Sequence, residues 1–244
     1  MPFEPSRQPQ PPYILRTGTA TAPPMAETAE RAFIAKVYRW MAVGLAVTAA
    51  VAGLVASSEA LLQLVVLNRW IFYGLMLAEF GLVVALSAMV QRLSGAAAGG
   101  LFLLYSALNG ATLSVVLLIY TQSSVAGAFG VTAATFGAMS VYGTVTKRDL
   151  TSWSTFLFMG LFGVVIAGLV NLFLQSSALS FVLSCMAVLV FTGLTAYDTQ
   201  KLRAYARAGG AEVAAAPITG ALTLYLDFIN LFLAILRLFG DRRR

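Results

Sequence analysis

The feature that most constrains this chain is a series of seven apolar segments, each about 20 residues long. A helix of about that length spans the ~30 Å hydrocarbon core of a bilayer and satisfies its own backbone hydrogen bonds there. One such run can be a buried helix of a soluble protein, but seven in succession are typical of a polytopic membrane protein. We therefore predict an all-α bundle of seven transmembrane helices at residues 36–57, 70–90, 98–120, 125–145, 155–174, 178–198 and 217–239.

The composition points to the lipid bilayer as the main partner of the chain. Of its 244 residues, 59% are hydrophobic and 11% are charged, and the mean hydropathy is +0.82. Soluble domains are closer to half apolar and a quarter charged. The net charge of +6 suits an anionic membrane surface. Because the basic residues lie between the apolar segments and form no patch, we predict no nucleic-acid binding.

Few residues are suited to enzyme chemistry. The chain has no histidine, and its single cysteine, Cys185, lies within an apolar run. Histidine-based triads, histidine-ligated metals and thiolate zinc sites are therefore excluded. We also find no G-x-S-x-G motif and no glycine loop that would cradle a phosphate. We expect no enzymatic activity and no resident cofactor.

The N-terminal region differs from the rest of the chain. Residues 1–30 contain seven of the eight prolines and lack the apolar core of a signal peptide. Such a segment cannot bury enough apolar surface to fold, so we predict a disordered cytoplasmic tail. The transmembrane domain is then expected at residues 31–244.

The distribution of lysine and arginine predicts the orientation. With the N-terminus inside, alternate loops carry most of the basic residues, and the outside loops carry only Arg69. We therefore predict a multi-pass protein of the plasma (inner) membrane with a cytoplasmic N-terminus. A full seventh span places the basic C-terminal residues 242–244 outside, whereas a re-entrant segment returns them to the cytoplasm; we expect the full span.

The fourth segment contains small residues at helical spacing. Gly127, Gly130, Ala134 and Gly137 fall on one face together with Val141. Small side chains let helices approach closely, so we predict that this face packs against a neighbouring helix.

The last segment carries a polar stripe through an otherwise apolar helix. Asp227 lies about ten residues from either end, roughly 15 Å from each interface. A carboxylate at that depth costs on the order of 3 kcal/mol unless it is protonated, paired or hydrated. Asp227 is therefore either a structural hydrogen-bond partner or part of an ion or proton pathway. Steps of three and four residues give the stripe as Gly220, Thr223, Asp227, Asn230, Ala234 and Arg237.

Two more acidic residues lie within the predicted spans. Glu79 is near the middle of the second, where a neutral interhelical hydrogen bond is the simplest role, and Asp198 is at the end of the sixth, where it could pair with Lys201. Acids without deep basic partners favour either a shared proton or a bound hard cation such as calcium. They therefore predict a pH-sensitive cation pathway, and a proton-coupled exchanger would use the same residues.

Two stretches resemble the Bax-inhibitor family of membrane proteins, in its bacterial form: Thr195–Lys201 (TAYDTQK) and Ala221–Gly240 (ALTLYLDFINLFLAILRLFG). Weaker similarity covers residues 30–240. The resemblance implies a seven-helix fold with the last helix in the centre, and a sixth helix that reaches deeper than residue 198. It also implies a pH-sensitive passive calcium leak gated by a pair of aspartates, here Asp198 and Asp227, which would be the calcium-contacting residues.

Other family features are matched less well. Some members have an arginine that latches onto the aspartate pair, but this sequence has Val90 at that position and its nearest cation is Arg92. The predicted supporting residues are Glu79, Thr223, Asn230, Arg237 and Arg92. The alternative function is a regulatory protein without transport, in which the N-terminal tail contacts a membrane-anchored AAA protease or another membrane partner.

Overall fold

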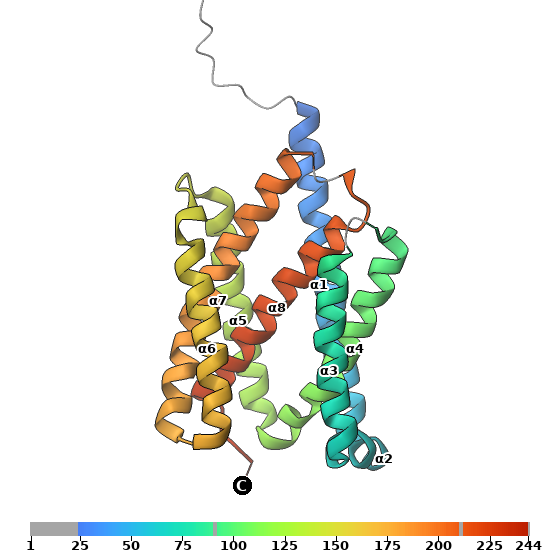
Figure 1. Ribbon diagram of the computed structural model, residues 1–244, viewed down its shortest axis with the longest axis vertical. Coiled ribbons are helices and arrows are strands. Elements are labelled where there is room, and N and C mark those ends of the chain that lie inside the picture. Colours follow the sequence, from blue (N-terminus) through green and yellow to red (C-terminus); the bar gives the residue numbers. More distant parts are fainter. Residues whose placement is uncertain (1–23, 90–91, 210–211, 244) are drawn as a thin grey trace, which may run out of the picture.

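Seven long apolar helices make up the body of the protein. The computed structural model describes residues 24–89, 92–209 and 212–243. All seven are long and apolar enough to cross a membrane, which confirms the predicted fold class. They are α1 (Pro24–Ser57), α3 (Arg69–Ala88), α4 (Gly95–Ile119), α5 (Gln122–Val145), α6 (Ser154–Leu174), α7 (Ser177–Arg207) and α8 (Ala216–Phe239) (Figure 1).

Short elements and polar caps separate the long helices. The short helix α2 (Glu59–Leu62) and the π-helical turn η1 (Gln63–Leu67) join α1 to α3, and the 3-10 turn η2 (Leu150–Trp153) leads into α6. Four long helices begin after a residue whose side chain accepts a hydrogen bond from the first turn, which satisfies an otherwise unpaired N–H group. These caps are Asn68, Ser94, Thr121 and Ser176.

Two boundaries differ from those predicted. Helix α1 begins at Pro24, so the expected tail boundary at residue 30 is too late; residues 1–23 lie outside the described residues. Helix α7 continues to Arg207, so the predicted end at residue 198 is too early. The longer helix agrees with the family resemblance, which implied a helix beyond residue 198. In both cases the polar helix end is stabilised by contacts with distant helices, which hydropathy alone does not reveal.

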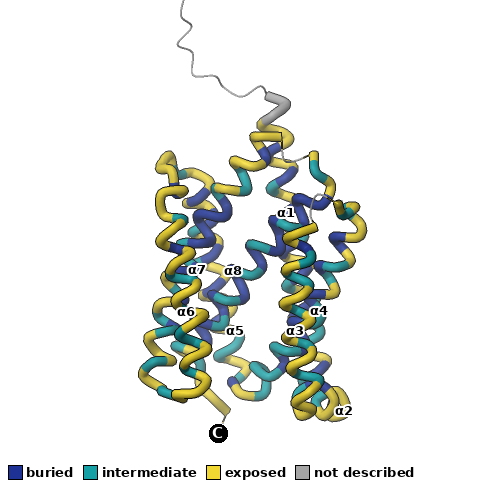
Figure 2. The backbone as a smooth tube through the Cα atoms, in the orientation of Figure 1, coloured by how far each residue is buried: buried dark blue, intermediate teal, exposed yellow. Residues whose placement is uncertain are grey.

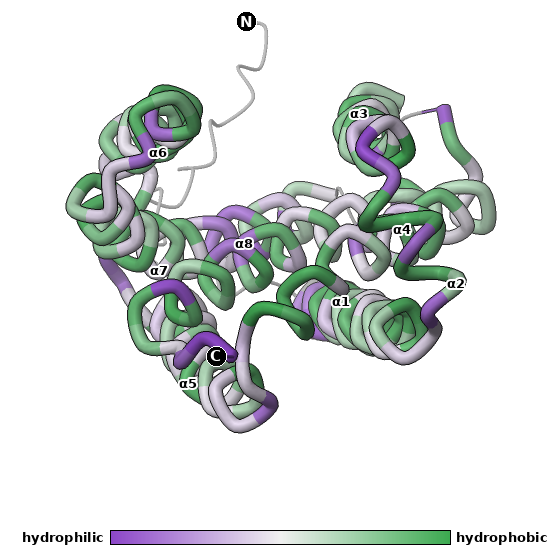
Figure 3. Tube along the Cα trace, turned by 90° about the horizontal axis from the view of Figure 1, so that it is seen from below, coloured by the Kyte–Doolittle hydropathy of each residue, from purple (hydrophilic) through white to green (hydrophobic). Residues whose placement is uncertain are grey.

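Helix α8 lies in the centre of the bundle, as predicted. It crosses diagonally between α1, α3 and α4 on one side and α5 and α7 on the other (Figures 1 and 3). Most of its leucines and aromatic residues are buried, with Leu222, Leu224 and Tyr225 among the least exposed side chains, although Phe239 at its end is exposed. By contrast, α3 and α6 lie on the outside and expose most of their surface (Figure 2).

The outer surface is apolar. Large side chains such as Leu77 and Phe80 on α3 and Phe162 and Phe173 on α6 are more than half exposed. Exposed apolar surface of this extent is unfavourable in water and favourable against lipid tails. The protein is therefore a multi-pass membrane protein.

The chain ends at the opposite end of the bundle from the start of α1 (Figure 1). The C-terminal residues pair with the connection between α4 and α5: Thr121 N–H donates to Asp241 O (3.1 Å), and Arg243 N–H donates to Ile119 O (2.8 Å). Helix α8 thus runs the full length of the bundle and is not re-entrant.

We predict that the N-terminal and C-terminal ends face opposite sides of the membrane, with the N-terminus in the cytoplasm. Most basic side chains of the described residues lie at the end where α1 begins, and this end should stay inside. A periplasm-active reporter fused after Arg244 should be active, and the same reporter fused before residue 24 should be silent. Cytoplasmic activity of the C-terminal fusion would contradict the arrangement.

The predicted packing face of α5 is wrong. Gly127, Gly130 and Gly137 have no atoms of other helices near the position that a side chain would occupy. This face of α5 is exposed and lies toward lipid. The opposite face of α5 packs against the other helices instead. That face comprises Ala128, Thr132, Phe136, Ser140 and Gly143.

The close helix contact of α5 is at Gly143. A side chain there would overlap the carbonyl oxygen of Ala196 on α7, so the two backbones touch. A similar contact joins α4 and α1, where a Cβ atom on Gly110 would lie 2.6 Å from Thr48 O. These approaches need glycine because any larger residue would separate the helices.

We predict that Gly143→Val destabilises the protein and that Gly137→Val, on the same helix, does not. The first substitution forces α5 away from α7, which should cost about 1–3 kcal/mol, as for other overpacked cores. The second adds a side chain to a lipid-facing surface. Thermal unfolding of the purified variants in detergent measures the difference, and equal midpoints would contradict the assigned packing face.

Candidate functional site

The structure brings Asp198 and Asp227 together where α7 packs against α8. At this contact, each of the two helices is at its most buried. The two aspartates are 8% and 5% exposed. The two carboxyl groups are neighbours that interact with each other across the contact between α7 and α8. Sequence reasoning alone placed Asp198 at a helix end, but the extension of α7 to Arg207 places it inside the helix.

Contact between two carboxyl groups is favourable only when a proton or a cation compensates their charge. Ionised carboxylates only accept hydrogen bonds, so two of them in contact repel each other unless one is protonated. Asp227 Oδ2 is buried and accepts no hydrogen bond from the N–H and O–H groups of the described residues. We call Asp198 and Asp227 the aspartate pair.

A pocket reaches Asp198 from the end of the bundle where α1 begins. It has a volume of about 230 Å³ and lies between α7 and the first turns of α8. Asp198 and Lys201 line it from α7, and Thr219 and Thr223 line it from α8. Thr223, a predicted supporting residue, therefore faces the approach to the pair, although its hydroxyl donates to Thr219 O (3.2 Å).

Beyond the pair, α8 is sealed by apolar packing. Leu231, Ala234 and Ile235 are buried between Asp227 and the far end of the helix. Asn230 turns back to its own helix and donates to Leu226 O (2.8 Å). A second pocket, of about 680 Å³, opens at the far end and is lined by Arg237, Ser180 and Ser184. Asp198 thus lines a pocket at one end of the bundle, whereas apolar side chains pack around α8 beyond Asp227.

The predicted arginines do not contact the pair. Arg237 is exposed and lies ten residues from Asp227, roughly 15 Å along α8. Arg92 is exposed in the connection between α3 and α4. Within the described part of the chain, no hydrogen bond or ion pair joins either arginine to an aspartate of the pair. Val90 lies outside the described residues.

Glu79 belongs to a separate polar network. Its carboxyl group accepts hydrogen bonds from two side chains of α4, Asn109 (3.1 Å) and Thr112 (2.8 Å). Asn109 in turn accepts one from the Tyr225 hydroxyl (3.0 Å), which lies 2.6 Å from the Thr48 hydroxyl of α1. The network therefore joins four helices through Tyr225, two residues before Asp227.

Sequence reasoning missed most of this network. It identified Glu79 and treated an interhelical hydrogen bond as its simplest role, which the structure supports. Asn109 and Thr48 were not singled out, although both are polar residues in the middle of apolar segments. Their position within apolar segments could have identified Asn109 and Thr48, because a polar side chain deep in the membrane needs a hydrogen-bond partner.

The aspartate pair alone is an incomplete calcium site. Calcium takes six to eight oxygen ligands, and the pair offers four carboxylate oxygens at most. The described residues contain no cluster of three or more acidic, cysteine or histidine side chains that could hold a metal ion. The remaining ligands would have to be backbone carbonyls or water, which suits a passing ion better than a tightly held one.

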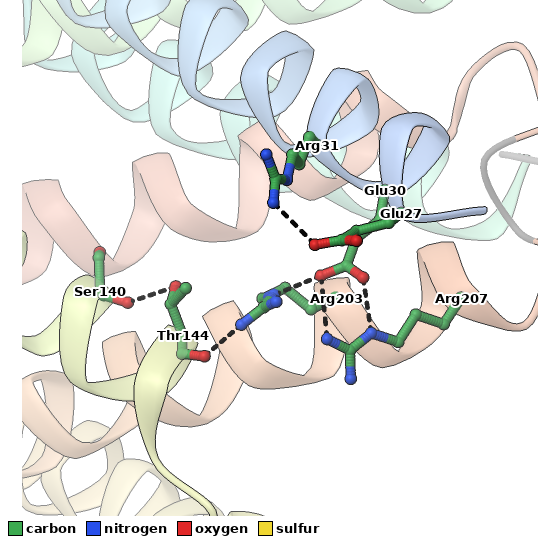
Figure 4. A network of polar contacts seen from close by, with 7 residues as sticks. All are labelled: Glu27, Glu30, Arg31, Ser140, Thr144, Arg203 and Arg207. Carbon is green, nitrogen blue, oxygen red and sulfur yellow. Dashed lines mark hydrogen bonds and ion pairs between the residues drawn. The ribbon is translucent and has the colours of Figure 1, made fainter. Parts of the chain in front are cut away.

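A buried ion-pair cluster also lies at the end where α1 begins. The Glu30 side chain, 6% exposed, accepts hydrogen bonds from Arg203 and from Arg207 (2.6 Å), both on α7 (Figure 4). Arg203 also donates to Thr144 O at the end of α5. This Glu30 cluster joins α1, α5 and α7, and sequence reasoning missed it because Glu30 fell in the predicted tail.

The fold and the site define a polytopic α-helical membrane protein in which the central helix α8 and its neighbour α7 each contribute one acid to a buried pair. A family model described as inhibitor of apoptosis-promoting Bax1 matches residues 30–244. The chain therefore belongs to the Bax-inhibitor family, as the two motifs indicated.

Close bacterial relatives cover nearly the same region. Inner membrane protein YbhL of Escherichia coli K12 is 51% identical over 215 residues, which are 86% of this chain and 92% of the relative. An uncharacterised protein of Deinococcus radiodurans is 50% identical over 214 residues, 87% of this chain and 91% of the relative. An uncharacterised protein of Borreliella burgdorferi is 44% identical over 214 residues, which are 86% of this chain and 92% of the relative.

We predict that Glu30→Gln lowers stability and that Glu27→Gln, one turn earlier on α1, has little effect. Removing the buried charge of Glu30 leaves two arginines without their partner; because both are partly exposed, we expect a cost of about 2 kcal/mol, below that of a fully buried pair. Glu27 pairs only with exposed Arg31 (2.7 Å), and such pairs contribute little. Thermal unfolding in detergent distinguishes the variants, and an unchanged Glu30→Gln midpoint would contradict the role of the cluster.

Proposed function

We propose that this protein is a passive, pH-sensitive cation leak of the inner membrane, with calcium as the transported ion and the aspartate pair as its gate. The observation that supports the proposal is the proximity of two buried carboxyl groups on neighbouring helices, one of which, Asp198, lines a pocket. The location follows that of the Escherichia coli relative, which is an inner membrane protein by name.

The gate would work through the proton that the pair shares. With one proton, the carboxyl groups attract each other and hold α7 against α8. Loss of that proton places two negative charges in contact, and this arrangement either separates the helices or draws in a cation. A cation that replaces the proton meets carboxylate oxygens, which are preferred ligands of calcium.

The proposed gate uses no arginine. A latching arginine would hold the aspartates as anions in the closed state, whereas this chain has valine at the matching position and Arg92 is exposed. The shared proton would therefore take the place of the latch. Because the closed state holds this proton, we expect the flux to rise as the pH increases through the range in which the pair loses it.

The test is a double-mutant cycle of Asp198→Asn and Asp227→Asn. Asparagine keeps the size and hydrogen bonding of aspartate but cannot ionise. We expect each single variant to change calcium flux into liposomes and to weaken its dependence on pH between about 6 and 8. Because the two residues act as one unit, the double variant should resemble the single variants, whereas independent residues would give additive effects on a logarithmic scale.

The matched control is Asp241→Asn, the same substitution in an exposed acid beyond α8. It should leave the flux and its pH profile unchanged. Glu79→Gln should have a smaller effect than either change in the pair, because Glu79 does not contact it. Unchanged flux in Asp227→Asn, or additive effects in the cycle, would exclude the gate.

A truncation of the N-terminal tail distinguishes a leak from a purely regulatory role. The start of α1 at Pro24 sets the last residue that can be removed. Deletion of residues 1–30 would also remove Glu30 and so disturb the bundle. Deletion of residues 1–23 keeps all of α1 and should leave the leak intact.

A further inference from the structure

A basic pocket lies at the end of the bundle where α1 begins, outside the aspartate pair. It has a volume of about 830 Å³ and is formed by the connection between α5 and α6 and the last turns of α7. Five cationic side chains and one acid line it: Lys147, Arg148, Lys201, Arg203, Arg207 and Asp149. We call this cavity the basic pocket.

Three of these cations are available to a ligand. Arg203 and Arg207 are both paired with Glu30. Lys147, Arg148 and Lys201 are exposed and form no ion pair within the described residues. Such an uncompensated group of cations at a membrane interface favours an anion.

The basic pocket is held in shape by Gln200 of α7. Its side-chain oxygen accepts a hydrogen bond from Leu150 N–H (2.9 Å), and its side-chain nitrogen donates to Arg148 O (2.9 Å).

Asp149 accepts hydrogen bonds from the side chain and the backbone N–H of Thr151, which lower its pKa and keep it ionised. The available charge of the pocket is therefore three cations against one anion.

An apolar groove continues from the basic pocket along the lipid-facing surface. It has a volume of about 460 Å³; α5 and α6 form its sides, and α7, on which both helices pack, forms its floor. Tyr197 lines both the groove and the basic pocket. On α7 the groove extends from Met186 to Tyr197, a rise of roughly 16 Å at 1.5 Å per residue.

The length and lining of the groove fit a lipid chain. One leaflet of the hydrocarbon core is about 15 Å thick, half of the ~30 Å total. Trp153, at the end of the groove near the basic pocket, is 59% exposed, as is usual for a tryptophan at the headgroup level. The deeper lining includes Phe156, Leu189 and Val190, none of which offers a polar group.

We propose that the basic pocket and the apolar groove together bind one anionic phospholipid, with its phosphate in the pocket and one acyl chain in the groove. A free phosphate would leave the groove unexplained, and a zwitterionic lipid would leave the cations uncompensated. The Lys201 ammonium lies 5.7 Å from the centre of the Tyr197 ring, so a cation of the basic pocket contacts the residue that joins the pocket and the groove. Lys201 lines the approach to Asp198 as well, which places the lipid headgroup beside it.

The test is native mass spectrometry of the full-length protein in detergent, titrated with phosphatidylglycerol or phosphatidylcholine of the same chain length. Each lysine or arginine near an anionic headgroup contributes roughly fivefold to affinity, so the wild type should prefer phosphatidylglycerol by more than tenfold. The variant Lys147→Gln/Arg148→Gln/Lys201→Gln should lose this preference. The matched control removes three cations from the opposite end, Arg69→Gln/Arg242→Gln/Arg243→Gln, and should keep it.

Two further measurements distinguish binding of a lipid from binding of a free phosphate. A phosphatidylglycerol with six-carbon chains should bind at least tenfold more weakly than one with sixteen-carbon chains, because it cannot fill the groove. Millimolar inorganic phosphate should not displace the long-chain lipid. Equal binding of the short-chain lipid, or displacement by phosphate, would reduce the site to a phosphate pocket and overturn the proposal.

Asp149→Asn gives a second variant that does not depend on the triple substitution. Asparagine can still cap η2, but the opposing negative charge is removed, so phosphatidylglycerol should bind roughly fivefold more tightly. No gain in this variant, or an unchanged preference in the triple variant, would contradict the proposal.

Discussion

The burial of Asp227 in the central helix is the constraint on which the rest of the site depends. A lone carboxylate in the middle of a membrane bundle is unstable, so it must be neutralised or paired. Helix α7 meets this requirement with Asp198, and its extension to Arg207 brings that residue to the right depth. The two carboxyl groups repel each other when both are ionised and attract each other when they share a proton, so their contact depends on protonation in a way that apolar packing does not.

The two sides of α8 are held by different kinds of contact. Toward α1 and α4, Tyr225 joins hydroxyl and amide groups, and Glu79 completes this network from α3. Toward α7, the contact at Asp227 is with another acid. Hydroxyl and amide contacts do not change over the physiological pH range, whereas a pair of carboxyl groups can gain or lose a proton. A change in the protonation of the aspartate pair would therefore act on the contact between α7 and α8, whereas on the other side of α8 only Glu79 could gain or lose a proton within the network described above.

The sequence predicted the seven helices, the central place of the last one and the two aspartates that meet, because apolar length and two motifs carry that information. It did not predict which face of α5 packs: Gly127 and Gly143 are both small residues, but only Gly143 meets another backbone. Glu30 was assigned to the tail because its partners, Arg203 and Arg207, are more than 170 residues away. Hydropathy shows that a segment is apolar; partners across such distances depend on tertiary packing.

The last turns of α7 bring the separate features together. Asp198 belongs to the aspartate pair, Gln200 holds the connection between α5 and α6, and Arg203 and Arg207 bind Glu30 of α1. All of them lie within three turns of one helix. A movement of α7 that separates Asp198 from Asp227 would therefore also strain the Glu30 cluster and the contacts of Gln200. Since α8 is enclosed by five helices, the energy of opening depends on how firmly this end of α7 is held, and contacts far from the aspartates in sequence help to set it.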